Sequence, residues 1–232
     1  MTADDQKKAA ARAALEYVKP GMKLGLGTGS TAKHFVNLIG EKVKAGLDVL
    51  CVPTSEETRK QAESLGIPLT TLDAHSFLDL TVDGADEFDA DFNVLKGGGG
   101  ALLREKIGAA SSRHVVIIAD QSKKVAMLGV HPVPIEVVPF GAKATAWKIE
   151  KACDYLGIKP SGMSVRQRDG KRFITEGGHI IIDCVVGRIP EPKRLADLLS
   201  MLPGVVDHGL FIGICGIILM GTPDGVTTFR KK

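Results

Sequence analysis

The stretch from residue 77 to residue 106 constrains the fold more than any other part of the chain. It begins with a largely apolar run of strand length, residues 77–82, which leads directly into Asp83 and Asp86. A buried strand of this kind is typical of a parallel sheet, in which ligands collect at the carboxyl ends of the strands. The two aspartates therefore occupy positions at which chemistry is expected.

Four consecutive glycines, residues 97–100, follow Lys96 in the same stretch. Glycine loses much conformational freedom on folding, but it lets backbone N–H groups approach a ligand closely. The helix expected over 101–111 then carries Glu105. Carboxylates, one lysine and open backbone donors thus occur close together, which predicts an active site. A solvated acidic turn, the plainer interpretation, needs neither the glycines nor the buried strand.

A second glycine-rich turn lies near the start of the chain. The strand expected over 22–26 runs into GLGTGSTA at 25–32, and a helix follows. Such a turn brings N–H groups and the positive end of the helix to one point, so an anion is the natural occupant. Hydroxyl groups of Thr28, Ser30 and Thr31 add further donors, and phosphate is the anion that we expect.

Two kinds of nucleotide site share parts of this pattern, but neither fits. The dinucleotide motif G-x-G-x-x-G is incomplete because Ser30 stands at its last position. The next expected strand, 48–53, ends on Thr54 and Ser55 where an acidic residue for the ribose is required. The turn also lacks the Gly-Lys-Ser/Thr ending of a P-loop. NAD and nucleoside triphosphates are therefore not expected.

Strands and helices alternate along the first half of the chain. Beyond the strand at 22–26, the patterns predict a helix over 55–65 and strands over 67–72 and 115–119. Alternation with short connections implies a right-handed, mostly parallel sheet with helices on both faces.

The pattern of alternating strands and helices changes after residue 128, where a proline-rich segment begins. From 133 to 211 the patterns predict the order β-α-β-β-α-β, including a hairpin over 173–186, and this order is typical of a ferredoxin-like domain. The apolar run 212–220 is expected to return to the first sheet. We therefore predict an α/β fold with two domains: a Rossmann-like, mostly parallel sheet in a catalytic domain of residues 1–128 and 209–232, and a smaller ferredoxin-like α+β domain of residues 129–208.

The net charge and the spacing of the cysteines indicate which binding partners and which cellular compartment to expect. A formal net charge of +3 and an aromatic content of 5% are too low for a nucleic-acid surface. The amino terminus has no apolar signal core, and the most apolar run, 209–221, is about half as long as a membrane helix. The four cysteines are widely spaced, as is typical of reduced thiols: Cys51, Cys153, Cys184 and Cys215. We therefore expect a cytoplasmic protein without nucleic-acid or membrane partners.

Four motifs stand in order along the chain: GLGTGSTA at 25–32, VDGADE at 82–87, KGGGGALLREK at 96–106 and LMGTPDGV at 219–226. In this combination the chain resembles ribose-5-phosphate isomerase type A over essentially its whole length. The resemblance implies a lid or oligomerisation role for the second domain, no metal or organic cofactor, and a homodimer or dimer of dimers. It also implies a sugar-phosphate substrate, D-ribose 5-phosphate, which is interconverted with D-ribulose 5-phosphate in the non-oxidative branch of the pentose phosphate pathway.

The resemblance assigns roles to residues that match the family motifs. Glu105 is similar to the proton acceptor of the family, and Asp83, Asp86 and Lys96 match its other catalytic residues. The residues that match its substrate-binding segments are Lys7, Thr28, Gly29, Ser30, Thr31, Gly84, Ala85, Gly97, Gly98, Gly99 and Lys123. The stretch FIGICGII at 211–218 departs from the family, because it lacks the polar residues that many members carry there.

Two functions of other classes use parts of the same pattern. A non-catalytic sugar-phosphate sensor could share the phosphate turn, but it would not need Glu105 behind the glycines. A magnesium-dependent phosphatase could use carboxylates as oxygen ligands, although the spacing is not the D-x-D of such enzymes, and Asp89 and Asp91 are expected to be solvated turn residues. The acidic residues open to that interpretation are Asp83, Asp86, Glu87, Asp89 and Asp91. The histidines show no metal-binding spacing.

Overall fold

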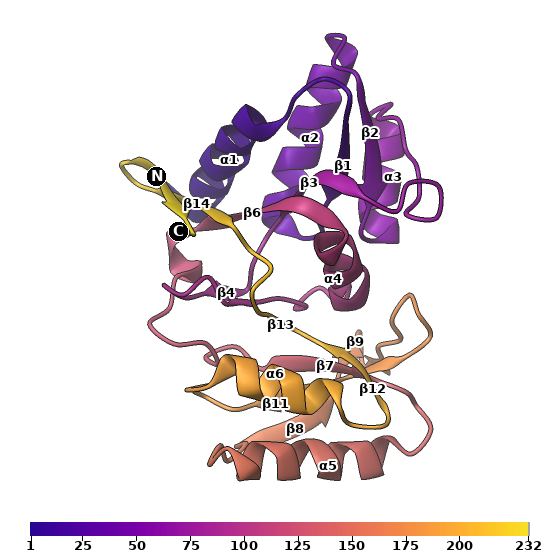
Figure 1. Cartoon of the computed structure of the whole chain (residues 1–232), viewed down its shortest axis with the longest axis vertical. Coiled ribbons are helices and arrows are strands. Elements are labelled where there is room, and N and C mark those ends of the chain that lie inside the picture. Colours follow the sequence, from indigo (N-terminus) through magenta and orange to yellow (C-terminus); the bar gives the residue numbers. More distant parts are fainter. Residues whose placement is uncertain (232) are drawn as a thin grey trace. The chain divides into compact units, whose positions relative to one another are not determined.

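The computed structural model describes residues 1–231, and the chain forms two compact units. Unit 1 comprises Met1–Ala85, Arg104–Lys124 and the chain from Gly213, whereas unit 2 comprises Asp86–Leu103 and Val125–Ile212. The elements of both units are labelled in Figure 1. The sequence pattern placed the boundaries after 128 and 208. The units differ from that division chiefly in Asp86–Leu103, because its strands pair with a strand of unit 2.

Unit 1 is built on a six-stranded sheet with the order β15-β14-β6-β3-β1-β2. Neighbouring strands are parallel except β14 and β15, which form an antiparallel hairpin whose loop is Pro223 and Asp224. The largely parallel sheet and the return of the chain to it near the carboxyl end are thereby confirmed. The strands are β1 (Met22–Leu26), β2 (Val49–Pro53), β3 (Leu78–Asp83), β6 (Ser112–Asp120), β14 (Ile217–Thr222) and β15 (Gly225–Arg230).

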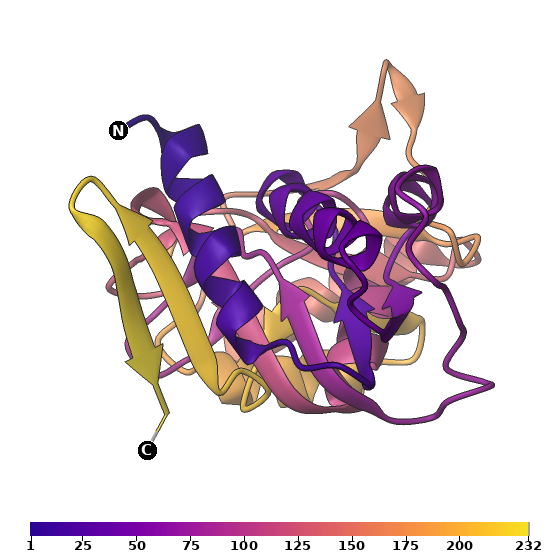
Figure 2. The ribbon, with the colours of Figure 1, turned by 90° about the horizontal axis from the view of Figure 1, so that it is seen from above.

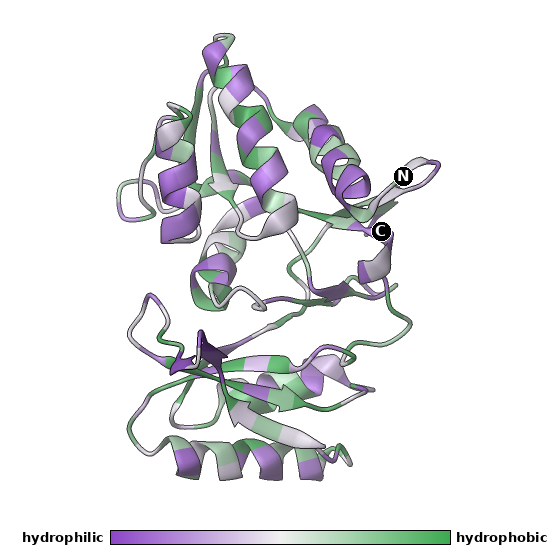
Figure 3. Ribbon diagram, turned by 180° about the vertical axis from the view of Figure 1, so that it is seen from behind, coloured by the Kyte–Doolittle hydropathy of each residue, from purple (hydrophilic) through white to green (hydrophobic). Residues whose placement is uncertain are grey.

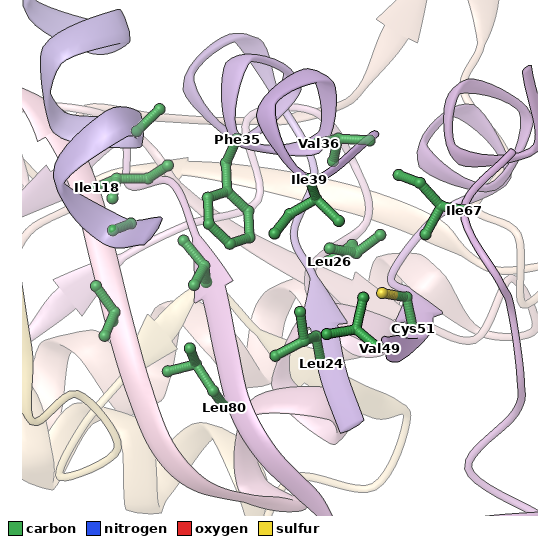
Figure 4. Packing of buried hydrophobic residues seen from close by; sticks show 14 of the residues in the cluster. Leu24, Leu26, Phe35, Val36, Ile39, Val49, Cys51, Ile67, Leu80 and Ile118 are labelled. Carbon is green, nitrogen blue, oxygen red and sulfur yellow. The ribbon is translucent and has the colours of Figure 1, made fainter. Parts of the chain in front are cut away.

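The helices of unit 1 bury apolar stripes against this sheet. Figure 2 shows α1 (Ala3–Ala14), α2 (Ser30–Lys44) and α3 (Glu56–Ser64) on one side of it, whereas α4 (Leu102–Ala110) lies on the other (Figure 1). In α2, the buried residues Phe35, Val36 and Ile39 recur at helical spacing and therefore share one face. Figure 4 shows Phe35 and Ile39 above strand residues such as Leu26 and Leu24.

Unit 2 contains a four-stranded antiparallel sheet with the order β12-β7-β11-β8. Its elements follow the chain as β-α-β-β-α-β, which confirms the ferredoxin-like prediction. The elements are β7 (Val133–Val137), α5 (Ala142–Tyr155), β8 (Gly162–Val165), β11 (Ile180–Val185), α6 (Pro192–Ser200) and β12 (Val205–His208). Figure 3 shows that the helices mix hydrophilic and hydrophobic residues, as expected for helices with one buried face.

Two smaller sheets complete unit 2. The first has the order β13-β5-β4, and the second is the hairpin of β9 and β10. The strands are β4 (Glu87–Phe88), β5 (Val94–Leu95), β9 (Gln167–Arg168), β10 (Lys171–Arg172) and β13 (Leu210–Phe211), and short 3₁₀ helices occur in unit 1 at η1 (Leu15–Tyr17) and η2 (Gln121–Lys123). No helix among the described residues is long and apolar enough to cross a bilayer.

One of the predicted elements is wrong, and another forms only in part. Residues 67–72 form only an isolated bridge between Leu69 and Cys51, since Pro68 cannot donate a ladder hydrogen bond. The hairpin predicted over 173–186 forms only in part: β11 is its second strand, and the N–H of Thr175 donates to the carbonyl of His179 at 2.9 Å across its turn, but its first arm is not a strand. The two-stranded hairpin of this region is formed by β9 and β10. Its two loop residues, Asp169 and Gly170, have φ values of 53° and 72°, which is the backbone that Asp-Gly favours in a tight hairpin turn.

The cysteines of the chain are free thiols, and all are buried. Burial raises the pKa of Cys51 and of Cys215 to about 12, and the thiolate is the reactive form. The native protein is therefore expected to react very slowly with Ellman's reagent at pH 8. All four thiols should react once guanidinium has unfolded the chain. Rapid reaction of the native protein would show that these thiols are accessible.

Candidate active site

Asp83, the last residue of β3, holds the ends of two strands of unit 1 together. Its Oδ1 atom accepts hydrogen bonds from the backbone N–H of Thr28 at 3.1 Å and of Gly84 at 2.7 Å. Gly27 permits this approach, because a methyl group there would lie 2.1 Å from the same oxygen. The carboxylate of Asp83 is buried and fixes the start of the glycine turn.

The glycine turn leads directly into α2. Gly29 has a φ of 110°, a conformation that glycine adopts easily, and the helix begins at Ser30. Lys7, on α1, donates from Nζ to the Ser30 hydroxyl at 3.1 Å. Gly84 also lies beside this turn, because a methyl group on it would be 3.9 Å from Cβ of Thr31. A helix N-terminus and a lysine thus meet at the predicted phosphate position.

The hydroxyl of Thr28 belongs to a cluster that sequence reasoning missed. It is hydrogen bonded to Thr54 Oγ1 at 2.9 Å, Ser55 Oγ at 2.8 Å and Thr58 Oγ1 at 3.2 Å. Thr58 also donates to the carbonyl of Gly27 at 3.0 Å. The hydroxyls after β2 therefore anchor the glycine turn. In the sequence, the signal was the run Thr54-Ser55, which we used only as an argument against a dinucleotide.

Lys123 lies at the end of η2, directly after β6. Asp120 caps this short helix by accepting from the N–H of Ser122 at 3.0 Å. The N–H of Gln121 donates to Oε1 of Gln6 on α1 at 3.2 Å, so η2 and α1 are joined. Lys123 and Lys7 thus stand on connected elements of unit 1, and both are partly exposed. Lys7, which contacts the first residue of α2, favours an anionic ligand at that helix N-terminus.

Glu105 lies in the first turn of α4 and is only 4% exposed. It shares a helix face with Gly108, three residues on, and a methyl group at Gly108 would lie 3.5 Å from the methyl carbon of Thr54. The helix α4 therefore lies beside Thr54 of the Thr28 cluster, and Glu105 is a buried carboxylate on that helix. Arg104, the residue before it, pairs with Glu56 of α3 at 3.3 Å. The helix starts at Leu102, one residue later than predicted.

In unit 2, the glycine loop that follows Lys96 is held by backbone geometry and by Asp86. Gly97 and Gly100 have φ values of 104° and 88°, which explains why glycine stands at these two positions. Asp86 Oδ2 accepts from the N–H of Gly98 at 2.7 Å. Lys96 is 3% exposed, and its Nζ atom lies 5.7 Å from the centre of the Phe211 ring.

The other acidic residues of this stretch stabilise loops of unit 2. Glu87 is buried, and it accepts from the N–H of Gly129 at 2.8 Å and from that of His131. Asp89 accepts from the N–H of Asp91 at 2.9 Å and from that of Asn93 at 3.0 Å, so it caps a turn and is not simply solvated. These contacts weaken the phosphatase interpretation. In the described part of the chain, no three His, Cys, Asp or Glu side chains are grouped to hold a metal ion.

The comparisons with known proteins agree with one another. A family model described as ribose 5-phosphate isomerase A (phosphoriboisomerase A) matches residues 50–225. Curated relatives with the name ribose-5-phosphate isomerase A include one from Rhodopseudomonas palustris strain HaA2, 56% identical over 231 residues with 100% of both chains covered. Another, from Parvibaculum lavamentivorans, is 57% identical over 227 residues and covers 97% of both.

Two solved structures are similar over the same length. Ribose 5-phosphate isomerase from Plasmodium falciparum superposes with a TM-score of 0.93 and 41% identity, covering 99% of each chain. A D-ribose-5-phosphate isomerase in complex with phospho-erythronic acid superposes with a TM-score of 0.92 and 37% identity, covering 100% of each chain. The α/β fold of this chain and its solved counterparts therefore correspond from end to end.

Proposed function

This chain belongs to the ribose 5-phosphate isomerase A family, and from that premise we propose how its residues interconvert D-ribose 5-phosphate and D-ribulose 5-phosphate. The reaction moves a proton between C2 and C1 of the sugar through an enediolate. It requires a base for the carbon-bound proton and a group that stabilises the negative oxygen. The observation that carries the proposal is Glu105, a buried carboxylate in the first turn of α4, the helix that approaches Thr54 of the Thr28 cluster at Gly108.

Glu105 is the proposed base. It takes the proton from C2 of the aldose, and negative charge develops on O1 as the enediolate forms. The same carboxyl group then returns the proton to C1, while the hydroxyl proton on O2 moves to O1 and leaves a carbonyl at C2. One group can perform both transfers because each carbon lies within reach of a single carboxylate when the sugar is held in place.

The remaining catalytic roles are assigned from the charge of each residue and from its capacity to donate or accept hydrogen bonds. Lys96 and the N–H groups of Gly97 and Gly99 are the proposed stabilisers of the oxyanion, since a cation and aligned dipoles act most strongly where water is excluded. The N–H of Gly98 is held by Asp86. Asp83 and Asp86 are proposed to hold sugar hydroxyls or assist ring opening. Their hydrogen bonds to Thr28, Gly84 and Gly98 give each of them a second task in shaping the loop beside it.

The phosphate group of the sugar is proposed to bind at the start of α2. The backbone donors of Gly29 to Thr31, the positive helix end, and the cations Lys7 and Lys123 support this position. A phosphorylated sugar acid, the ligand of one solved relative, offers a phosphate at one end and a carboxylate at the other. It is therefore a suitable probe of both halves of the proposed site.

Thr31→Ala tests the phosphate position. Thr31 is buried in the first turn of α2, and loss of a hydrogen bond to a charged group is expected to raise KM about ten- to a hundredfold. Inhibition by inorganic phosphate should weaken in parallel, while kcat changes little. Thr227→Ala, on the exposed face of β15, serves as the control. A slower chemical step with unchanged phosphate inhibition would mean that the other end of the sugar lies here.

A coupled assay on ribose 5-phosphate, with and without EDTA, tests the function itself. Turnover is expected and should survive EDTA, because the proposed lysine and glycine donors neutralise the enediolate without a cation. Loss of activity that magnesium restores would revive the metal-dependent alternative. Binding of ribose 5-phosphate without turnover would support the sugar-phosphate sensor instead.

We also propose that the enzyme works in the cytoplasm as a homodimer or a dimer of dimers. The buried free thiols suit a reducing compartment. Apolar side chains of unit 2 that face solvent, Phe140 at 91% exposure and Trp147 at 59%, are the kind of residue that an oligomer covers. Light scattering on the eluting peak of a sizing column would give the mass of the assembly.

A further inference from the structure

Arg166 lies between β8 and β9 in unit 2, and a carboxylate fixes its orientation. Nε donates to Oδ2 of Asp183 at 2.9 Å, and Nη2 donates to Oδ1 of the same residue. The side chain of Arg166 is 14% exposed and that of Asp183 is 20% exposed. Such a two-point contact holds the plane of the guanidinium group, which a single contact cannot do.

The remaining nitrogen of Arg166 reaches the glycine loop. Nη1 donates to the carbonyl of Gly97 at 2.6 Å and to that of Gly98 at 3.1 Å. Arg168 donates from Nη2 to the carbonyl of Gly99 at 3.1 Å. The central carbon of its guanidinium group, Cζ, lies 4.4 Å from the centre of the Phe173 ring. Successive carbonyls of the loop therefore point toward one arginine-bearing segment.

The orientation of these carbonyls determines where the N–H groups point. The chain has no cis peptide bond among its described residues, so the N–H of each peptide points opposite to its C=O. The peptide between Gly97 and Gly98 shows this directly, since its oxygen meets Arg166 and its N–H meets Asp86 at 2.7 Å. The next peptide also presents its oxygen to Arg166, so the N–H of Gly99 points away from the arginine as well.

Successive N–H groups that point the same way form a small concavity that attracts anions. We propose that Arg166, clamped by Asp183, is a positioning residue that fixes the peptides of the glycine loop, so that the Gly98 N–H meets Asp86 and the Gly99 N–H is presented to the oxyanion of the enediolate. This role rests on the isomerase reaction proposed above, and it assigns a task to a residue outside the family motifs at 25–32, 82–87 and 96–106. Four glycines in a row have little rigidity of their own, and the contacts of Arg166 on the carbonyl side and of Asp86 on the N–H side supply it.

Arg166→Ala is expected to lower kcat about ten- to a hundredfold, since small displacements of transition-state donors are costly. KM for ribose 5-phosphate and inhibition by inorganic phosphate should stay within a few-fold of the parent. Arg166→Lys should be intermediate, because an ammonium group cannot grip Asp183 at two points and reach both carbonyls. Methylguanidinium added to Arg166→Ala should restore part of the lost kcat. Arg172→Ala, which removes an exposed arginine of the same hairpin, is the control.

A second variant separates positioning from folding. The double substitution Arg166→Met with Asp183→Asn removes both charges of the pair, so neither is left without its partner. The melting temperature should therefore recover relative to Arg166→Ala, while kcat stays low. A folded double variant with kcat near the parent would overturn the proposal, as would a parallel loss of phosphate inhibition. If the isomerase assignment itself were wrong, the unaltered protein would fail to turn over ribose 5-phosphate. That result is distinct from a loss of kcat confined to the Arg166 variants.

Discussion

Glu105→Gln is expected to lower kcat about a hundred- to ten-thousand-fold, the range in which a general base usually contributes. Glutamine keeps the shape of the side chain and its capacity for hydrogen bonds, but it cannot accept the carbon-bound proton. Because Glu105 is buried in the first turn of α4, the isosteric change should leave the packing around it intact. KM for ribose 5-phosphate should therefore change by no more than a few-fold.

Two measurements check this expectation. The coupled assay gives kcat, and exchange of the C2 proton with solvent deuterium reports the proton transfer separately. Glu57→Gln makes the same chemical change at an exposed position in the first turn of α3, and it should leave both rates unchanged. If Glu105→Gln still isomerises and exchanges near the parent rate, the role of base passes to Asp83 or Asp86.

Lys96→Met is expected to lower kcat about a hundred- to a thousandfold, as removal of an oxyanion donor does. The effect should fall mainly on kcat because the negative oxygen exists only along the reaction path. Methionine preserves the apolar stem of this buried side chain beside Phe211. Lys159→Met, at an exposed site of unit 2, is the control. A rise in KM with unchanged kcat would assign Lys96 to substrate binding.

Much of the fold could be predicted because local signals agree with it. The strand at 22–26 was predicted with the bounds of β1, since an apolar run there ends at glycines. The hairpin at Asp169 and Gly170 was missed although its signal is local. Those two residues are a standard two-residue turn, but strands of two residues on either side provide no apolar alternation to indicate them.

The candidate site was less predictable because several of its contacts join distant segments. The clamp on the glycine loop depends on Arg166 and Gly97, which are 69 positions apart. The cluster around Thr28 combines residues that follow β1 with residues that begin α3. A glycine loop and a catalytic carboxylate have recognisable sequence patterns, whereas the residues that orient them are identified only once the chain is folded.

The position of β14 in the sequence also determines when unit 1 can be completed during synthesis. β14 pairs with β6, and Gly221 in it lies so close to α1 that a methyl group would be 2.0 Å from the carbonyl oxygen of Gln6. The ribosome makes α1 roughly 200 residues before β14, an interval of about ten to forty seconds at elongation rates of about 5–20 residues per second. β6 is made roughly 100 residues before β14, and from then until β14 emerges the edge of β6 that pairs with β14 has no strand to cover it. The nascent chain is therefore at its most vulnerable to aggregation in this second half of the interval.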